Sequence, residues 1–397
     1  MRPQFSFALC SIAAASVAAG CGDNYGSTTP PVVDAAIVDT MPPDACVPTT
    51  ARGTVTRGNL AMDASQRAVF LDMEPPLDRS ILFYSVRENE PSPRFGAITC
   101  ELVPADTVAA TPAGLSCRHE SMGTDSVPPV PVTIHWQVVT FNLGVRVQRG
   151  LADTSIVNPQ TVTLTAVDPA KSFVVLGGAL SGGSGWGNND FTIAQLKSGT
   201  SLEIRHNAPG SFVPWQVVEM DGAVVRRGTS SLTTAETMKT VPLTGVPGGS
   251  IVLATHTNDN PQALAASAMM LQATLNNGSL VLKRAMAGTA MEIAYEVITM
   301  PFVARQFTTD FAAGEKTKMQ AIADLPARAV AFSTVQAIAG QSTGSTSYAD
   351  LTTLDLVGEA AATLTVSAGG VSVQRETAAS AASITWNVVD FGDDACN

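Results

Sequence analysis

The stretch Ile134-His135-Trp136-Gln137-Val138-Val139-Thr140-Phe141 decides the fold, because the chain repeats its pattern at residues 213–220, 293–300 and 384–391. The shared pattern is an aliphatic residue, any residue, an aromatic residue, a polar residue, valine, an aliphatic residue, a polar residue, and Phe or Met. Successive aromatic positions are 79, 80 and 91 residues apart, which is the length of a small domain and too long for a solenoid repeat. The sequence therefore predicts four tandem modules. Their aromatic residues are Trp136, Trp215, Tyr295 and Trp386.

The composition of these modules favours strands over helices. Charged residues make up 14% of the chain, below the usual quarter, and the plentiful Gly, Ser, Thr, Ala and Val suit short strands and tight turns. The second module holds six short segments of alternating pattern, which is typical of an antiparallel sandwich. These segments are 145–149, 161–165, 172–176, 191–196, 201–206 and 213–220. The predicted fold class is all-β, with small antiparallel β-sandwich modules at residues 51–142, 143–221, 222–301 and 302–397.

The aromatic strand of each module is apolar on both faces. In the first copy Ile134, Trp136 and Val138 share one face, by the period of two in a strand, while Val139 and Phe141 lie on the other. Either a bulge turns the end of the strand, or the second face is covered by the next module or by another subunit. Because the modules are closely spaced, we favour coverage.

A second repeated motif, Val-x-Arg-Gly or a variant of it, opens each module. It begins a few residues after the aromatic segment of the preceding module, which leaves little room for a flexible linker. We therefore expect neighbouring modules to contact each other. The four copies are at residues 55–58, 147–150, 225–228 and 303–306.

A basic residue also precedes each aromatic strand. Stacking of its charged group on the aromatic ring of that strand is the role that we expect, because a cation over a Trp face contributes about 1 kcal/mol. These residues are Arg118, Arg205, Lys283 with Arg284, and Arg375.

The N-terminus resembles that of a bacterial lipoprotein. Arg2 gives a short positive segment, residues 5–19 are apolar but too short to span a bilayer, and Ala18-Ala19-Gly20-Cys21 resembles a lipobox. The resemblance implies a signal peptide at residues 1–20 and a lipid on Cys21 that attaches the protein to a membrane. An ordinary secretory signal with a chance cysteine is the alternative.

The residues after Cys21 extend this resemblance. Gly22 replaces the Asp that retains familiar Gram-negative lipoproteins at the inner membrane, which implies a cell-envelope location at the outer membrane, in either leaflet. Residues 21–50 contain Pro30-Pro31 and Pro42-Pro43 and have no periodic apolar face. We expect this segment to be a lipidated, disordered tether.

Four cysteines remain after signal cleavage and lipidation, and four thiols allow three pairings. We favour Cys100 with Cys117, which lie in one predicted hairpin, and Cys46 with Cys396, which would join the start of the folded region to its end. The first pair closes a loop of about 17 residues and would contribute about 3 kcal/mol.

One loop has the composition of a ligand site. Residues 181–190 surround Trp186 with glycines and place Asn188, Asn189 and Asp190 beside it, which resembles a sugar-stacking loop. A solvated hairpin loop has the same composition. The polar loop at residues 256–260 lacks the full pattern of a calcium site, and we expect no metal and no other cofactor.

Several function classes are disfavoured by the sequence. A net charge of -11 without a basic stripe argues against nucleic-acid binding. Gly340-Gln341-Ser342-Thr343-Gly344 has the spelling of a nucleophile elbow but not its strand-turn-helix context, and no spacing picks out a catalytic triad or carboxylate pair. His119 and His135 lie in one module, and a metal site there would need a third ligand. We predict that the protein is not an enzyme.

The module is similar in outline to the H-type lectin domain. It has a predicted six-stranded sandwich, a Val-x-x-Gly start, a strand pair around proline and a last strand of the aliphatic-x-Trp type. The resemblance implies the topology more than sugar binding, because many sandwich folds share an outline without sharing function. We expect a membrane-anchored cell-envelope lipoprotein that acts as a structural or adhesive binding protein and contacts proteins or glycans of the cell surface. The alternative is a carbohydrate-binding, lectin-like surface protein.

Overall fold

The computed structural model describes most of the chain after residue 51. The segments that it describes are 52–63, 66, 68–88, 98–105, 112–119, 131–177, 188, 191–207, 212–259, 266–276, 278–326, 328–333, 337–339, 362–376, 378 and 381–392. The predicted signal peptide, the predicted tether and residues Cys21, Cys46 and Cys396 lie outside these segments.

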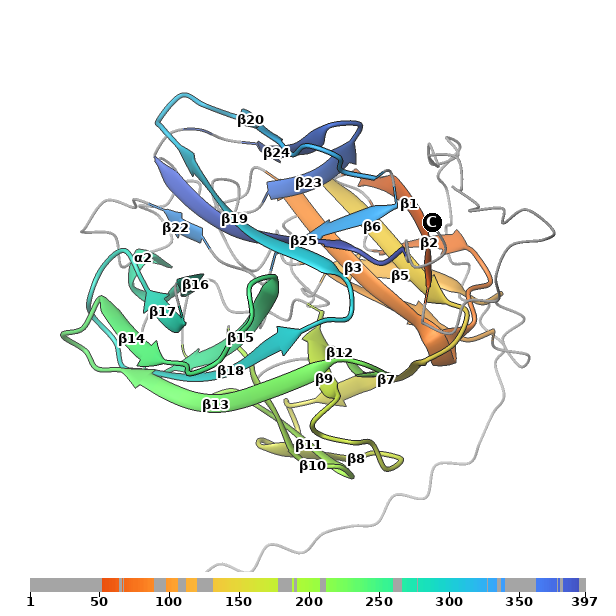
Figure 1. Cartoon of the computed structure of the whole chain (residues 1–397), viewed down its shortest axis with the longest axis horizontal. Coiled ribbons are helices and arrows are strands. Elements are labelled where there is room, and N and C mark those ends of the chain that lie inside the picture. The colour runs from red at the N-terminus through yellow and green to blue at the C-terminus, as the bar shows by residue number, and fades with distance from the viewer. Residues whose placement is uncertain are drawn as a thin grey trace, which may run out of the picture. The chain divides into compact units, whose positions relative to one another are not determined.

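Strands dominate the described residues and form pairs of antiparallel sheets, four pairs in sequence order (Figure 1). We call β1–β6 module 1, β7–β12 module 2, β13–β18 module 3 and β19–β25 module 4. In each module the strand with the repeated aromatic residue is the central strand of one sheet, which we call the aromatic sheet. The other sheet is the partner sheet. The all-β prediction of tandem sandwich modules is confirmed.

Modules 1 and 2 have the same strand order. In module 1 the aromatic sheet is β1 (Gly53–Met62), β6 (Val132–Phe141) and β3 (Ser80–Glu88), and the partner sheet is β2 (Ala68–Asp72), β5 (Gly114–His119) and β4 (Ile98–Val103). In module 2 they are β7 (Val145–Asp153), β12 (Phe212–Met220) and β9 (Ser172–Leu176), and β8 (Gln160–Thr163), β11 (Ser201–Arg205) and β10 (Ile193–Ser198). The six strands predicted for the second module are all present. A 3-10 helix, η1 (Leu77–Arg79), precedes β3.

Modules 3 and 4 repeat this order. In module 3 the sheets are β13 (Val224–Leu232), β18 (Met291–Thr299) and β15 (Ser250–Asn258), and β14 (Met238–Pro242), β17 (Ser279–Lys283) and β16 (Gln272–Asn276), with the short helix α2 (Ala266–Met269) before β16. In module 4 they are β19 (Val303–Phe311), β25 (Ala382–Asp390) and β21 (Ala329–Phe332), and β20 (Thr317–Ala321), β24 (Gly370–Arg375) and β23 (Ala362–Ser367). The strand β22 (Ala337–Ala339) also pairs with β25.

Each sandwich has a core that holds one face of the aromatic strand, and the core of module 4 also contains Phe191 of module 2 and Met269 and Met270 of module 3. In module 1, Ile134, Trp136 and Val138 are buried with Leu115 and the cysteine pair of the partner sheet. The corresponding aromatic residues of the other modules are buried in the same way. Burying a side chain of this size stabilises the fold by about 2–3 kcal/mol, so each module depends on its repeated aromatic residue.

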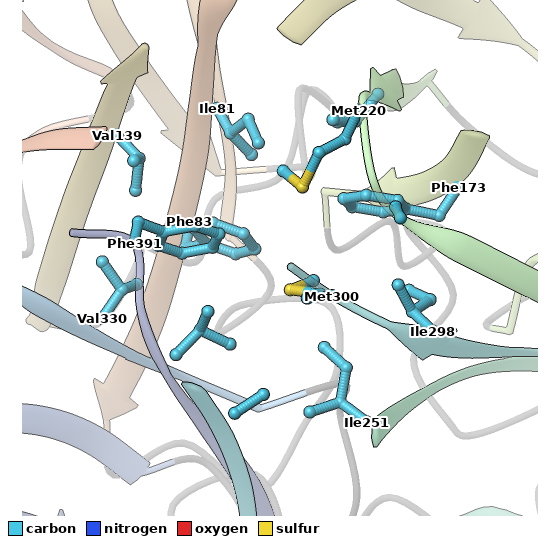
Figure 2. Close-up of a cluster of buried hydrophobic side chains, with 14 of the residues drawn as sticks. Ile81, Phe83, Val139, Phe173, Met220, Ile251, Ile298, Met300, Val330 and Phe391 are labelled. Atoms are coloured by element: carbon cyan, nitrogen blue, oxygen red, sulfur yellow. The ribbon is translucent and has the colours of Figure 1, made fainter. Parts of the chain in front are cut away.

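The other face of the four aromatic strands builds a single core that the modules share. Val139 and Phe141 pack there with their counterparts from modules 2, 3 and 4. Figure 2 shows these side chains converging, with Phe83 and Phe391 from modules 1 and 4 on one side and Phe173 and Met220 from module 2 on the other. The register of β6 with both of its neighbours is continuous, so no bulge is involved. The expectation that other modules cover the second face is confirmed.

The first and last modules also contact each other. The Gly53 N–H donates to the Phe391 oxygen at 2.8 Å, which brings the start of β1 to the end of β25. Phe83 stacks on Phe332 of module 4 with ring centroids 4.3 Å apart. The modules are therefore not an open string, because module 4 meets module 1 through the shared core.

Cys100 on β4 and Cys117 on β5 form a disulfide with an S–S distance of 2.12 Å. They lie directly opposite each other in the strand register, and both are buried. This is the pair that the sequence predicts within the first module, and its position indicates a structural role. The equivalent positions in module 2 are Ala194 and Ile204, so that module fills the same space with aliphatic side chains.

Candidate functional site: the junctions between modules

The polar residue that follows each repeated aromatic residue points into the junctions between modules. Gln137, Gln216, Glu296 and Asn387 occupy equivalent places, and each is no more than 9% exposed. A buried polar group costs free energy unless it finds a hydrogen-bond partner. The partners of these side chains therefore show what holds one module to the next.

Gln216 of module 2 pairs with the backbone of module 1. The Leu82 N–H donates to Gln216 Oε1 at 3.0 Å, and Gln216 Nε2 donates to the Leu82 oxygen at 2.9 Å. Leu82 lies on β3, an edge strand of its sheet. An edge strand leaves a row of backbone groups without a strand partner, and the side-chain amide supplies one donor and one acceptor to it.

Gln137 of module 1 makes the same contact with module 4. Gln137 Nε2 donates to the Ala331 oxygen at 2.5 Å, and the Ala331 N–H donates to Gln137 Oε1 at 3.2 Å. Ala331 lies on β21, which pairs with β25 at the position equivalent to Leu82 on β3. In these two junctions the polar side chain of one module therefore reaches an edge strand of the module before it, with module 1 reaching module 4.

The arginine of the Val-x-Arg-Gly motif supports each of these contacts. Arg57 Nη2 donates to the Ala329 oxygen at 2.9 Å, and Arg149 Nη2 donates to the oxygens of Leu77, at 2.6 Å, and Ser80. Burial lowers the pKa of Arg149 to about 10, with Asp78 opposing the shift, so Arg149 stays charged at neutral pH. A charged donor to a carbonyl makes a stronger hydrogen bond than a neutral one.

The junction between modules 2 and 3 contains a carboxyl group in place of the amide. The Val174 N–H on β9 donates to Glu296 Oε2 at 2.7 Å, and Arg227 Nε lies 3.4 Å from Glu296 Oε1. Arg227 also donates to the oxygens of Pro169 and Ser172, at 2.7 and 2.6 Å. Burial raises the pKa of Glu296 to about 7, while the Val174 N–H and Arg227 oppose that shift.

The junction between modules 3 and 4 departs from this arrangement, and the predicted fourth copy of the opening motif is one residue out of register. Gln306, and not Arg305, lies opposite Asn387. Val303 is 58% exposed, whereas Ala304 is buried in the shared core. Sequence spacing aligned Val303 with the buried valines because the last three copies begin 78 residues apart, and only the strand register reveals the shift.

Gln306 and Asn387 also have different partners from the other junction residues. Gln306 Nε2 donates to Asn387 Oδ1 at 3.2 Å, and the Leu275 N–H of module 3 donates to Gln306 Oε1 at 2.8 Å. Gln272 of module 3 adds a hydrogen bond of 2.7 Å from its Nε2 to Thr385 Oγ1. This junction therefore uses contacts with β16, which belongs to the partner sheet of module 3.

The prediction that the basic residues stack on the repeated aromatic rings is wrong, because the described cation–ring contacts of Arg118 and Arg375 are with Phe212 and Phe311. Arg284 is 1% exposed and donates to four backbone oxygens, those of Glu236, Ala268, Thr289 and Thr233. Arg375 donates to the oxygens of Glu315 and Ala312, and its guanidinium lies 4.9 Å from the ring of Phe311. These arginines hold the turns between the first two strands of modules 3 and 4.

The described histidines are part of the packing. His135 Nδ1 lies 2.9 Å from Asn59 Oδ1, and His206 exchanges two backbone hydrogen bonds with the Asn158 side chain. His256 donates from Nε2 to the Met269 oxygen at 2.7 Å and stacks on Phe191, and burial lowers its pKa to about 4. His256 is therefore neutral near pH 7. The described residues contain no group of three or more His, Cys, Asp or Glu that could hold a metal ion.

A groove of about 660 Å³ lies between module 2 and module 3. Its lining comes from β10, β13, β14 and β18 and carries hydroxyl groups together with Lys239 and Glu292. The residues that line it include no aromatic side chain, so this groove lacks the flat ring on which a sugar stacks. The groove therefore suits a polar ligand or the backbone of an extended peptide more than a stacked sugar.

Most of the predicted ligand loop lies outside the described residues. Asn188 is described, and its oxygen accepts a hydrogen bond of 3.1 Å from the Asn207 N–H. Trp186, Asn189 and Asp190 are not among the described residues, and neither is the motif at 340–344.

No known family model matches the chain, and no curated protein matches it. Among the described residues, no helix is both long enough and apolar enough to cross a membrane.

The polar residues of the junctions hold the modules together, and the sequence patterns did not single them out. The signal was present, because a polar residue recurs at the same place in four otherwise apolar strands. A buried strand that keeps a glutamine or a glutamate needs a partner for it, and that requirement could have pointed to a contact between modules.

Proposed function

We propose that this protein is a lipid-anchored, non-enzymatic cell-envelope protein of the outer membrane that acts as a structural or adhesive binding protein. Its four modules serve as one rigid support, and its partners are proteins or glycans of the cell surface. The anchor is the lipid on Cys21, and residues 21–50 separate the support from the membrane.

The shared core is the observation that carries this proposal. One face of each aromatic sheet is used to hold the other modules, and the buried arginines and polar side chains of the junctions are occupied by backbone groups. Such contacts favour a fixed support over moving catalytic parts. Loops remain available for binding, as on other rigid β scaffolds.

Module 2 offers the clearest binding surface among the described residues. Ile156 is 81% exposed and Val157 is 54% exposed on the loop between β7 and β8. Phe212, at the start of β12, is 43% exposed beneath the guanidinium of Arg118. Exposed aliphatic and aromatic side chains together are typical of protein contact surfaces, which supports protein partners.

The anchor is tested by fractionating cells that express the full chain. We expect Cys21→Ser to move the protein from the membrane fraction to the soluble fraction, because the thiol that carries the lipid is lost. Cys10→Ser is the matched control, since that cysteine lies within the predicted signal peptide and its loss should leave the protein in the membrane. A Cys21→Ser protein that stays in the membrane fraction would remove the lipid anchor from the proposal.

The binding role is tested with the purified protein on isolated cell envelopes. Adhesion through proteins predicts binding that protease treatment of the envelopes abolishes and that Ile156→Ser with Val157→Ser weakens. The lectin-like alternative predicts binding to a glycan array that is lost in Trp186→Ala and is insensitive to protease. Binding to neither surface would contradict the adhesive role.

A further inference from the structure

Glu296 differs chemically from Gln216 and Gln137, which occupy the equivalent place in two other junctions. Gln216 and Gln137 each accept from a backbone N–H and donate to the carbonyl of the same residue. Glu296 occupies the equivalent place in module 3 and accepts from the Val174 N–H. An ionised carboxylate only accepts hydrogen bonds, whereas a protonated one has an O–H donor and matches the pattern of an amide.

Among the described residues, one charged group contacts Glu296. Arg227 on β13 approaches Glu296 Oε1 at 3.4 Å, and its two terminal nitrogens already donate to the oxygens of Pro169 and Ser172. From β9 the contacting group is the Val174 N–H, and on β15 the residue opposite is Leu253. A buried carboxylate is stabilised only by strong pairing, and here the cation is shared with two carbonyl groups.

We propose that Glu296 holds a proton in the folded protein and that the junction between modules 2 and 3 is a proton-binding site that weakens as the pH rises. The protonated carboxyl takes the place of the glutamine amide found at the equivalent junctions. Loss of the proton leaves a charge that is buried at the contact between β18 and β9.

The direction of the pH dependence follows from the pKa of Glu296, which burial raises from its usual 4.5 to about 7 in the folded state. Between these values the folded protein keeps a proton that the unfolded chain has released. Stability from this group is therefore complete below about pH 4.5 and is lost as the pH rises through about 7. The folding equilibrium constant should fall on the order of a hundredfold across this window through Glu296 alone.

The strand that carries Glu296 also lines the groove between modules 2 and 3. Glu292 and Ile293 are on β18 with Glu296, and they line the groove together with Ile193 and Gln195 of β10. Weakening of the contact between β18 and β9 would therefore change the separation of the groove walls. The groove should be widest, and the junction most open, in mildly alkaline solution.

The test compares Glu296→Gln with Gln216→Glu in the full chain, with unfolding followed by circular dichroism from pH 4.5 to 8.5. Glu296→Gln should raise the midpoint temperature at pH 8.5, by about 5 °C for a protein of this size. The wild-type midpoint should decrease between pH 4.5 and 7, and this decrease should be smaller in Glu296→Gln. Gln216→Glu should add a second decrease of the midpoint temperature with rising pH, because it places a carboxyl group in the junction between modules 1 and 2.

A local measurement keeps the test independent of global unfolding. Infrared spectra of the wild-type protein at pH 5.5 should show the carbonyl stretch of a buried protonated carboxyl, absent from Glu296→Gln. Hydrogen exchange at the Val174 amide should accelerate with pH relative to the Leu82 amide, which donates to Gln216.

An ionised Glu296 predicts different results in the same experiments. If Glu296 is ionised throughout and serves as the partner of Arg227, Glu296→Gln will lower the midpoint at every pH and leave its slope unchanged. The infrared band will then be missing at pH 5.5, and the proposal is overturned.

Discussion

The junction between modules 1 and 2 and the junction between modules 3 and 4 both contain hydrogen-bonded polar side chains, but the side chains and their partners differ. In the first, Gln216 satisfies both backbone groups of Leu82, and Arg149 holds the carbonyls that precede β3. In the second, Gln306 and Asn387 bond to each other, and Gln306 accepts from Leu275 on another strand. The difference shows that the repeat preserves the shared apolar core more strictly than the polar contacts around it.

Side-chain length accounts for part of this difference. Asparagine is one methylene shorter than glutamine, so Asn387 has a shorter reach toward a neighbouring edge strand. Module 4 also replaces the glycine of the opening motif with Phe307, which stacks on Trp386 with ring centroids 4.8 Å apart. Module 4 therefore gains contacts within its own sandwich at the junction where the shared pattern is lost.

The largest effect is expected from removing the amide at the junction between modules 1 and 2. Gln216→Leu should destabilise the protein by about 3 kcal/mol, because the buried N–H and C=O of Leu82 both lose their partner. Asn387→Leu, the matched change in module 4, should cost about 1 kcal/mol, since it removes a single hydrogen bond to Gln306. Urea unfolding of both variants measures the two costs, and equal costs would contradict the distinction between the junctions.

A smaller effect is expected from the glycine beneath the aromatic ring of module 1. A Cβ on Gly58 would lie 2.8 Å from Trp136 Cζ2, so Gly58→Ala should cost about 1–3 kcal/mol by displacing a buried ring. Gly248→Ala is the control, because a Cβ there meets no atom within 4 Å. Thermal unfolding should separate the two variants, and matching midpoints would mean that the ring has room to move.

The sequence predicted the modules and the coverage of the second face of each aromatic strand, but not the polar contacts that join the modules. The fourfold pattern around Trp136 and the alternation in module 2 fix strand number and the buried face, because strand period and burial are local properties. The disulfide pair followed from two cysteines in one predicted hairpin.

The remaining features depend on residues far apart in the chain. Gln137 contacts Ala331 across 194 residues, and no local pattern encodes which edge strand a side-chain amide will reach. The shift of the fourth opening motif was missed for a similar reason, because spacing alone cannot distinguish exposed Val303 from buried Ala304. Strand register, which is set by the whole module, decides such cases.

Calorimetry of the full chain tests the central claim that the four modules share one core and fold as one cooperative unit. We predict a single transition in which the calorimetric and van't Hoff enthalpies agree, and we predict that Gln216→Leu moves the whole transition to lower temperature. Two or more separate transitions, with Gln216→Leu shifting only one of them, would contradict the account.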